Sequence, residues 1–90
     1  MNEIILNSIN KEFRINKLFI FGNDSFQSDI DVLIVSDDFA NISLTKRKML
    51  IKKSSFKLDP ICLTPKEFNK LKNSKSSLWN KISTQGQRIR

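Results

Sequence analysis

Two aspartates, Asp29 and Asp31, flank a single isoleucine at the start of an apolar segment, and their spacing could support metal chemistry. Residues at positions i and i+2 of a β-strand point to the same face, so the two carboxylates would lie close together. Such a pair can bind one or two hard divalent cations, which prefer carboxylate and phosphate oxygens. Aspartates at loop ends also bond to the backbone of turns, and this alternative stays open for the pair taken alone.

The composition excludes most other catalytic chemistries. The 90 residues include no histidine, one cysteine and two glycines. Without histidine there is no Ser-His or Cys-His catalysis, and the single Cys62 cannot form an internal disulfide or a thiolate zinc site. We interpret Cys62 as a small buried hydrophobic residue. The two glycines, Gly22 and Gly86, lie too far apart in the sequence to form a Walker loop or a glycine-rich dinucleotide loop, so aspartates holding a metal remain the favoured chemistry.

Charge is distributed unevenly along the chain. The net charge is +7, residues 60–90 carry seven bases and one acid, and the segment between Lys17 and Lys46 has five aspartates and no base. Clustered carboxylates repel one another unless a cation neutralises them, which again favours a metal site. The basic end would suit an acidic partner surface, with nucleic-acid binding as a secondary possibility. We interpret the bases of 46–48 and 52–53 as a solvated helix face.

Short apolar segments predict strands near 17–22, 29–36 and 57–63, and the second of them is rich in β-branched residues. Pro60 lies inside the third segment, and because proline has no N–H to donate, this strand should lie at a sheet edge or have its amide side free at that position. Asp37 and Asp38 follow the second segment and should start a turn.

Helices are predicted over 2–15 and 44–53, after Thr64 and from about Ser77. Thr64, Pro65 and Glu67 have the spacing of a capping box with proline in the first turn, and Gly86 should end the last helix. The expected fold is α/β (α+β): a small mixed sheet of three or more strands, with helices packed on the face opposite the two aspartates.

Length and hydropathy indicate one domain without a membrane segment. Ninety residues fit a single domain over 1–90. The apolar segments are far shorter than the ~18 residues of a membrane span, and the amino terminus lacks the basic and apolar regions of a signal peptide. We therefore expect a cytoplasmic protein that does not bind a membrane.

Two ordered segments resemble the minimal nucleotidyltransferases, which are relatives of the DNA polymerase beta nucleotidyltransferase fold. Residues 21–23 (FGN) and 28–35 (SDIDVLIV) are similar to the family's apolar strand with Gly-Ser, its spacer and its Ser-Asp-Ile-Asp strand. Residues 59–68 (DPICLTPKEF) resemble the later strand that carries the third acid. The resemblance covers about residues 17–90 and implies the fold of that family.

The resemblance also implies the site residues. Asp29 and Asp31 would ligate two Mg²⁺ or Mn²⁺ ions, and Asp59 would hold the catalytic one and help to deprotonate an acceptor hydroxyl. Two metals about 4 Å apart clamp the attacking and leaving oxygens in this chemistry, which needs charge neutralisation and alignment more than covalent help.

The nucleotide would contact Gly22, Asn23 and Ser28, with the backbone around Gly22 approaching the phosphates of ATP. Asn23 stands where the family has serine, and the spacer from Asn23 to Asp29 is shorter than usual. These departures support an alternative function: a catalytically degenerate module that binds a partner protein or nucleic acid.

The substrate and partner are implied by family analogy. Members of this size commonly pair with a second small protein that binds nucleotide or RNA. The best-known arrangement is an antitoxin that transfers AMP from ATP onto a HEPN-type toxin, and a protein acceptor is therefore the expected substrate. We therefore expect a nucleoside triphosphate as donor, and either a small HEPN-like protein or a second copy of this chain as partner.

Overall fold

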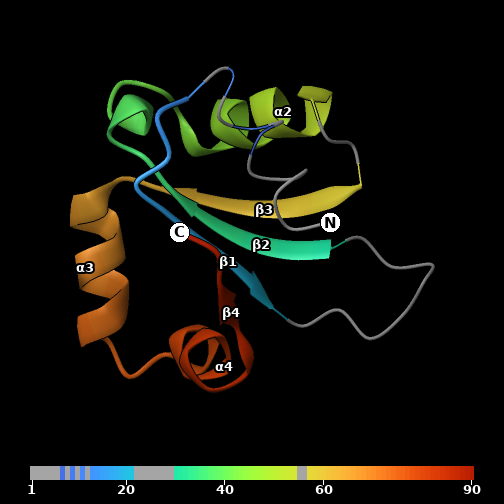
Figure 1. The fold of residues 1–90 in the computed structure, drawn as a ribbon. Helices are drawn as coiled ribbons and strands as arrows, with labels where there is room; N and C mark the ends of the chain where they lie inside the picture. Colours follow the sequence, from blue (N-terminus) through green and yellow to red (C-terminus); the bar gives the residue numbers. More distant parts are fainter. Residues whose placement is uncertain (1–6, 8, 10, 12, 22–29, 55–56) are drawn as a thin grey trace.

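The computed structural model describes residues 7, 9, 11, 13–21, 30–54 and 57–90 (Figure 1). Most of the helix predicted over 2–15 lies outside the described residues; residues 7 and 9 are helical, whereas residues 13–15 are not. In chain order the elements are β1 (Lys17–Phe21), β2 (Ile30–Val35), the 3₁₀ helix η1 (Asp37–Phe39), α2 (Leu44–Ser54), β3 (Leu58–Leu63), α3 (Pro65–Asn73), α4 (Ser77–Gln85) and β4 (Gln87–Arg88). The three predicted strands and the helices near 44–53, 65 and 77 are thus confirmed, as is the turn at Asp37.

The strands form one mixed sheet in the order β3-β2-β1-β4, which confirms the predicted fold class. β1 is antiparallel to both β2 and β4, whereas β2 and β3 are parallel and are joined through α2. Pro60 lies on β3, an edge strand, as its missing N–H predicts. The short strand β4 was not predicted, because Gln87 and Arg88 show no apolar pattern and pair through their backbone alone.

Helices cover both faces of the sheet, so the prediction that they pack on one face is wrong (Figure 1). α2 lies on one face, and α3 and α4 lie on the other. The reason is visible in β2, where Val32 and Ile34 pack into one buried cluster while Leu33 and Val35 pack into the other. A strand with apolar residues at both alternations needs cover on both faces.

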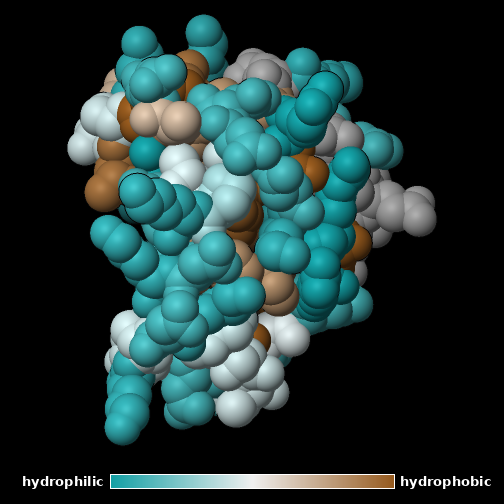
Figure 2. Space-filling view, turned by 90° about the vertical axis from the view of Figure 1, so that its left-hand side faces the viewer, coloured by the Kyte–Doolittle hydropathy of each residue, from teal (hydrophilic) through white to brown (hydrophobic). Residues whose placement is uncertain are grey.

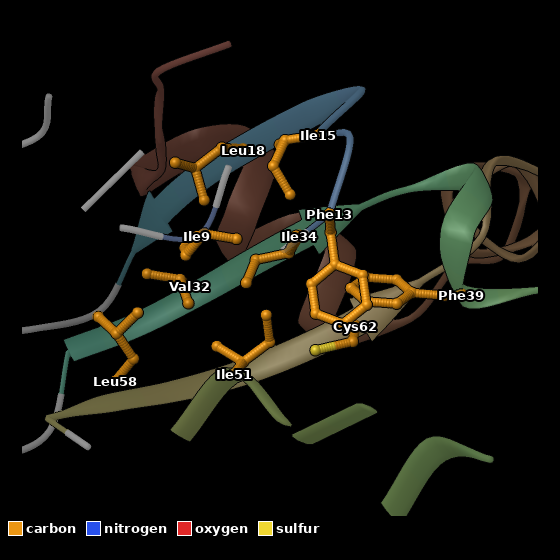
Figure 3. Close-up of a cluster of buried hydrophobic side chains, with 10 residues drawn as sticks. All are labelled: Ile9, Phe13, Ile15, Leu18, Val32, Ile34, Phe39, Ile51, Leu58 and Cys62. Carbon is orange, nitrogen blue, oxygen red and sulfur yellow. The ribbon is translucent and has the colours of Figure 1, made fainter. Parts of the chain in front are cut away.

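The cluster beneath α2 is the larger of the two (Figure 3). Strand, helix and amino-terminal residues meet in it: Ile9, Phe13, Ile15, Leu18, Val32, Ile34, Phe39, Ile51, Leu58 and Cys62. The spacing of four between Ile9 and Phe13 predicts one shared helix face, and both side chains are buried in this cluster.

Local signals in the sequence place the carboxy-terminal helices. Thr64 and Glu67 form the predicted capping box at the start of α3, with Pro65 in the first turn. Gly86 caps the end of α4 with an ordinary φ of −74°, and its N–H donates to the Ile82 carbonyl oxygen. A β-carbon at position 86 would collide with that oxygen, so close approach explains the glycine.

The surface at the α3 end of the molecule is mostly hydrophilic (Figure 2). Large hydrophobic side chains that are exposed in the described part of the chain are Leu44 and Met49, both on α2. Among the described residues, no helix has the length and hydrophobicity needed to cross a membrane.

Candidate active site

Phe21, Asp31 and Asp59 are register partners across three neighbouring strands. Phe21 ends β1 and pairs with Asp31, the second residue of β2, which in turn pairs with Asp59, the second residue of β3. Phe21 packs into the cluster under α3 and α4, and register partners share a face, so both acids belong to that face. Neighbouring strands lie about 4.8 Å apart, which brings the two carboxylates within reach of one cation. We call Asp31 and Asp59 the acidic pair.

The topology explains why the acidic pair forms at this end of the sheet. β2 and β3 are parallel, so an acid in second position on each strand falls at the same, amino-terminal end. β1 is antiparallel to β2, so the chain leaves β1 at this same end, directly before Gly22. The Ile30 N–H donates to the Lys57 carbonyl oxygen at 2.9 Å and fixes the start of the two strands.

Four of the predicted site residues lie outside the described residues: Gly22, Asn23, Ser28 and Asp29. Their roles therefore stay predictions. Over residues 13–21, 30–54 and 57–90, with residues 7, 9 and 11, no three acidic, histidine or cysteine side chains gather to hold a metal. Of the predicted acids, Asp31 and Asp59 lie in the described part of the chain.

Two lysines, on two different helices, contact residues of the Phe21–Asp31–Asp59 register. The Lys48 ammonium, from α2, lies 3.1 Å from an Asp59 carboxylate oxygen. From α4, the Lys81 ammonium lies 5.9 Å from the centroid of the Phe21 ring, on the face that carries the acids. A cation at this place can meet phosphate oxygens.

Neither lysine was predicted as part of the site. Lys81 is far from the aspartates in sequence, and no local pattern connects them. Lys48 shares a helix face with Lys52, whose ammonium also turns toward β3 and donates to the Leu58 carbonyl oxygen at 3.3 Å. The spacing of four does not show which side of α2 meets β3, so the sequence alone does not indicate the contact of Lys48.

The acidic pair fits a hard divalent cation. Its donors are carboxylate oxygens, which Mg²⁺ and Mn²⁺ favour. The Asp59 side chain is 48% exposed and can be reached from solvent, and it already attracts the Lys48 ammonium. When no cation is bound, two neighbouring carboxylates repel, so a dication relieves that repulsion.

The interpretation of residues 46–48 as a solvated face is wrong for Arg47, whose side chain is only 5% exposed. Its guanidinium donates to the Ile42 and Cys62 carbonyl oxygens at 2.8 and 3.1 Å, and it lies 2.7 Å from a Glu67 carboxylate oxygen. We call these contacts the Arg47 network. It joins α2, β3 and α3 at the end of the sheet away from the acidic pair.

Cys62 is buried, as predicted. Burial raises the pKa of its thiol to about 12, against the smaller opposite effects of the positive charges on Arg47 and Lys48. A thiol that stays protonated at neutral pH is a poor nucleophile, so Cys62 has a structural role in the core.

Neither a family model nor a curated protein matches the sequence, but solved structures match the fold. A protein from Sulfolobus solfataricus, provisionally described as a nucleotidyltransferase, aligns with a TM-score of 0.58 at 21% identity, over 76% of this chain and 68% of that one. The chain has the nucleotidyltransferase fold.

Two further structures with this nucleotidyltransferase fold are toxin–antitoxin complexes. One is a tri-AMPylated HEPN toxin of Shewanella oneidensis with MNT antitoxin (TM-score 0.59, 21% identity, 100% of this chain and 72% of that one). The other is an MntA-HpeT mutant in which two aspartates, two positions apart, are replaced by glutamate (TM-score 0.62, 14% identity, 100% and 73%). At these identities the likeness establishes the fold, as the sequence resemblance predicts.

Proposed function

We propose that this protein is a metal-dependent nucleotidyltransferase that transfers AMP from ATP onto a partner protein. The observation that carries the proposal is the register of Phe21, Asp31 and Asp59, which sets two carboxylates beside the strand end that leads into Gly22. The same acids are those that the family resemblance assigns, and the fold agrees with it.

The proposed site combines the acidic pair with residues outside the described part. Asp29, Asp31 and Asp59 would hold Mg²⁺ or Mn²⁺, which supplies neutralisation of the triphosphate charge when bound. Gly22, Asn23 and Ser28 would line the phosphates. The positive charge of Lys81, on α4, would also help to neutralise the triphosphate.

Side chains of the protein would then accept the proton of the acceptor hydroxyl and align this hydroxyl with the α-phosphate. An acceptor hydroxyl oxygen attacks the α-phosphorus of ATP, the bond to the β-phosphate oxygen breaks, and pyrophosphate leaves. In this scheme Asp59 accepts the proton of the hydroxyl, since its half-exposed carboxylate can meet an acceptor arriving from solvent.

A protein acceptor is the favoured substrate. Three of the structures that share the fold are toxin–antitoxin complexes, and one of these contains AMP-PNP. An antitoxin acting on a small HEPN-type toxin fits this setting. We propose that this partner, or a second copy of the chain, brings the acceptor hydroxyl to the site.

Ligand-dependent stabilisation tests whether the acidic pair binds its ligands. A ligand that binds only the folded state adds about 2.7 kcal/mol at one hundred times its Kd. Thermal unfolding with Mn²⁺ and ATP should therefore show a raised Tm for the wild type and no rise for Asp31→Asn, because a neutral amide is a poor ligand for a hard dication.

Asp37→Asn is the matched control, since Asp37 lies beyond the opposite end of β2 and the substitution removes the same charge. Its ligand-induced shift should equal that of the wild type. A full shift in Asp31→Asn would contradict cation binding at the acidic pair.

A further inference from the structure

The ion pair between Lys48 and Asp59 bridges α2 and the edge strand β3. The ammonium lies 3.1 Å from the carboxylate oxygen, and the two side chains are 52% and 48% exposed. α2 packs on the face of β3 opposite the acidic pair, but β3 is an edge strand. A long lysine side chain can therefore reach round that edge to Asp59.

This contact has the properties of an exchangeable one. Lysine is a compact charge on a flexible stem, and the carboxylate that Lys48 contacts is open to solvent. Such half-exposed pairs are weak and are screened by salt. The ammonium can leave Asp59 without leaving a buried charge behind.

The same carboxylate is needed by the proposed site. An ammonium ion and a divalent cation at one carboxylate repel each other, so their binding to Asp59 is competitive. With no cation bound, Lys48 neutralises one of the two neighbouring acids and so reduces their mutual repulsion.

We propose that Lys48 is an internal counter-ion which a divalent cation must displace from Asp59, so that Lys48 sets the cation affinity of the site. The inference rests on the proposed function, because it assumes that the acidic pair binds a dication. Lys48 acts on the metal through Asp59: its ammonium occupies the carboxylate and so weakens the binding of a divalent cation there.

Titration of the full chain with Mn²⁺ alone tests this, with free Mn²⁺ measured by electron paramagnetic resonance at low salt. Lys48→Met should lower the Kd for Mn²⁺ by about two- to tenfold, the range expected for removing one nearby unit charge. Lys48→Arg keeps the charge and should stay within about twofold of the wild type. Added KCl should reduce the difference between wild type and Lys48→Met.

Lys46→Met is the control for net charge. Lys46 lies two residues earlier on α2, about 200° round the helix, and is exposed. Its removal should leave the Kd within about twofold of the wild type. An equal gain in Lys46→Met and Lys48→Met would overturn the proposal, because the effect would then belong to the overall charge of the helix.

The remaining outcomes separate this inference from the proposed function. If wild type and Lys48→Met bind Mn²⁺ equally, or if the variant binds more weakly, Lys48 does not compete with the cation. The proposed metal site is retained in that case, because Mn²⁺ still binds. If Mn²⁺ binds to none of the proteins although circular dichroism shows them folded, both the counter-ion role and the metal site are wrong.

Discussion

Arg47 and Lys48 are consecutive residues of α2, yet their ion pairs belong to two different kinds of region. Arg47 is 5% exposed and combines its ion pair to Glu67 with hydrogen bonds to two backbone carbonyls. Lys48 is 52% exposed and pairs with the half-exposed Asp59. The Arg47 guanidinium is fixed at the carboxyl ends of β2 and β3. The Lys48 ammonium lies at the amino ends of these strands, beside the acidic pair.

The difference shows that burial and the number of hydrogen bonds decide what an ion pair does. If the buried Arg47 guanidinium left its position, two carbonyl oxygens and the Glu67 carboxylate would lose their donor. The Arg47 network therefore holds three elements together. A half-exposed lysine loses little on leaving, because water replaces its contact. The first arrangement suits a structural role and the second suits a binding site.

The largest effect should come from Arg47→Met. The substitution leaves the Ile42 and Cys62 carbonyls without their donor and Glu67 without its partner. Removing one member of a buried ion pair costs about 3–5 kcal/mol of unfolding free energy. Because Glu67 is partly exposed, we expect a loss of about 3 kcal/mol, at the lower end of this range. Urea denaturation measures it, and a loss below about 0.5 kcal/mol would contradict the structural role of the network.

Thr64→Ala should cost less, because it removes one half of the capping box that joins the Arg47 network to α3. The Thr64 hydroxyl accepts from the Glu67 N–H at 3.2 Å, while the Glu67 carboxylate still accepts from the Thr64 N–H. Loss of such a cap costs about 1 kcal/mol. The same urea titration checks this value, and an unchanged midpoint would show that the cap is not stabilising.

Acid should weaken the Arg47 network through Glu67. Burial raises the pKa of Glu67, but its hydrogen bonds with Arg47 and Thr64 outweigh this and hold that pKa below the ordinary value of 4.5. The unfolded state then binds the proton first, so this part of the stability is present above that value and is lost as the pH falls below it. Urea midpoints from pH 7 to pH 3 should therefore converge for wild type and Glu67→Gln; parallel curves would contradict the lowered pKa.

The smallest effect on stability should come from Lys48→Met. Without a divalent cation, this half-exposed pair contributes at most about 1 kcal/mol, and the contribution should shrink as salt is added. Thermal unfolding in low and high KCl measures it. A loss as large as that of Arg47→Met would erase the contrast between the two regions.

The sequence predicts the parts of the fold that local patterns control. The apolar strands, the capping box at Thr64 and the edge position of Pro60 follow from side-chain alternation, hydrogen bonding and the missing N–H of proline. β4 is set by backbone pairing between residues with no apolar pattern, so sequence alone does not indicate it. Cover on both faces of the sheet could have been expected from the continuous apolar run of β2.

The candidate site is predictable only in part, because some of its features depend on tertiary packing. The family resemblance indicates Asp31 and Asp59, and the register places them side by side. The sequence does not indicate that Arg47 is buried and Lys48 is not, because both are bases within one charged run. Their difference depends on which side of α2 meets β3 and α3, which is a property of tertiary packing.

Label transfer from ATP tests the central claim most directly. The full chain is incubated with Mg²⁺, a HEPN-type partner protein and ATP radiolabelled on either the α- or the γ-phosphate. We predict covalent label on the partner from α-labelled ATP alone, lost in Asp31→Asn and Asp59→Asn and kept in Asp37→Asn. Label from the γ-position, or undiminished transfer by Asp59→Asn, would contradict nucleotidyl transfer at the acidic pair.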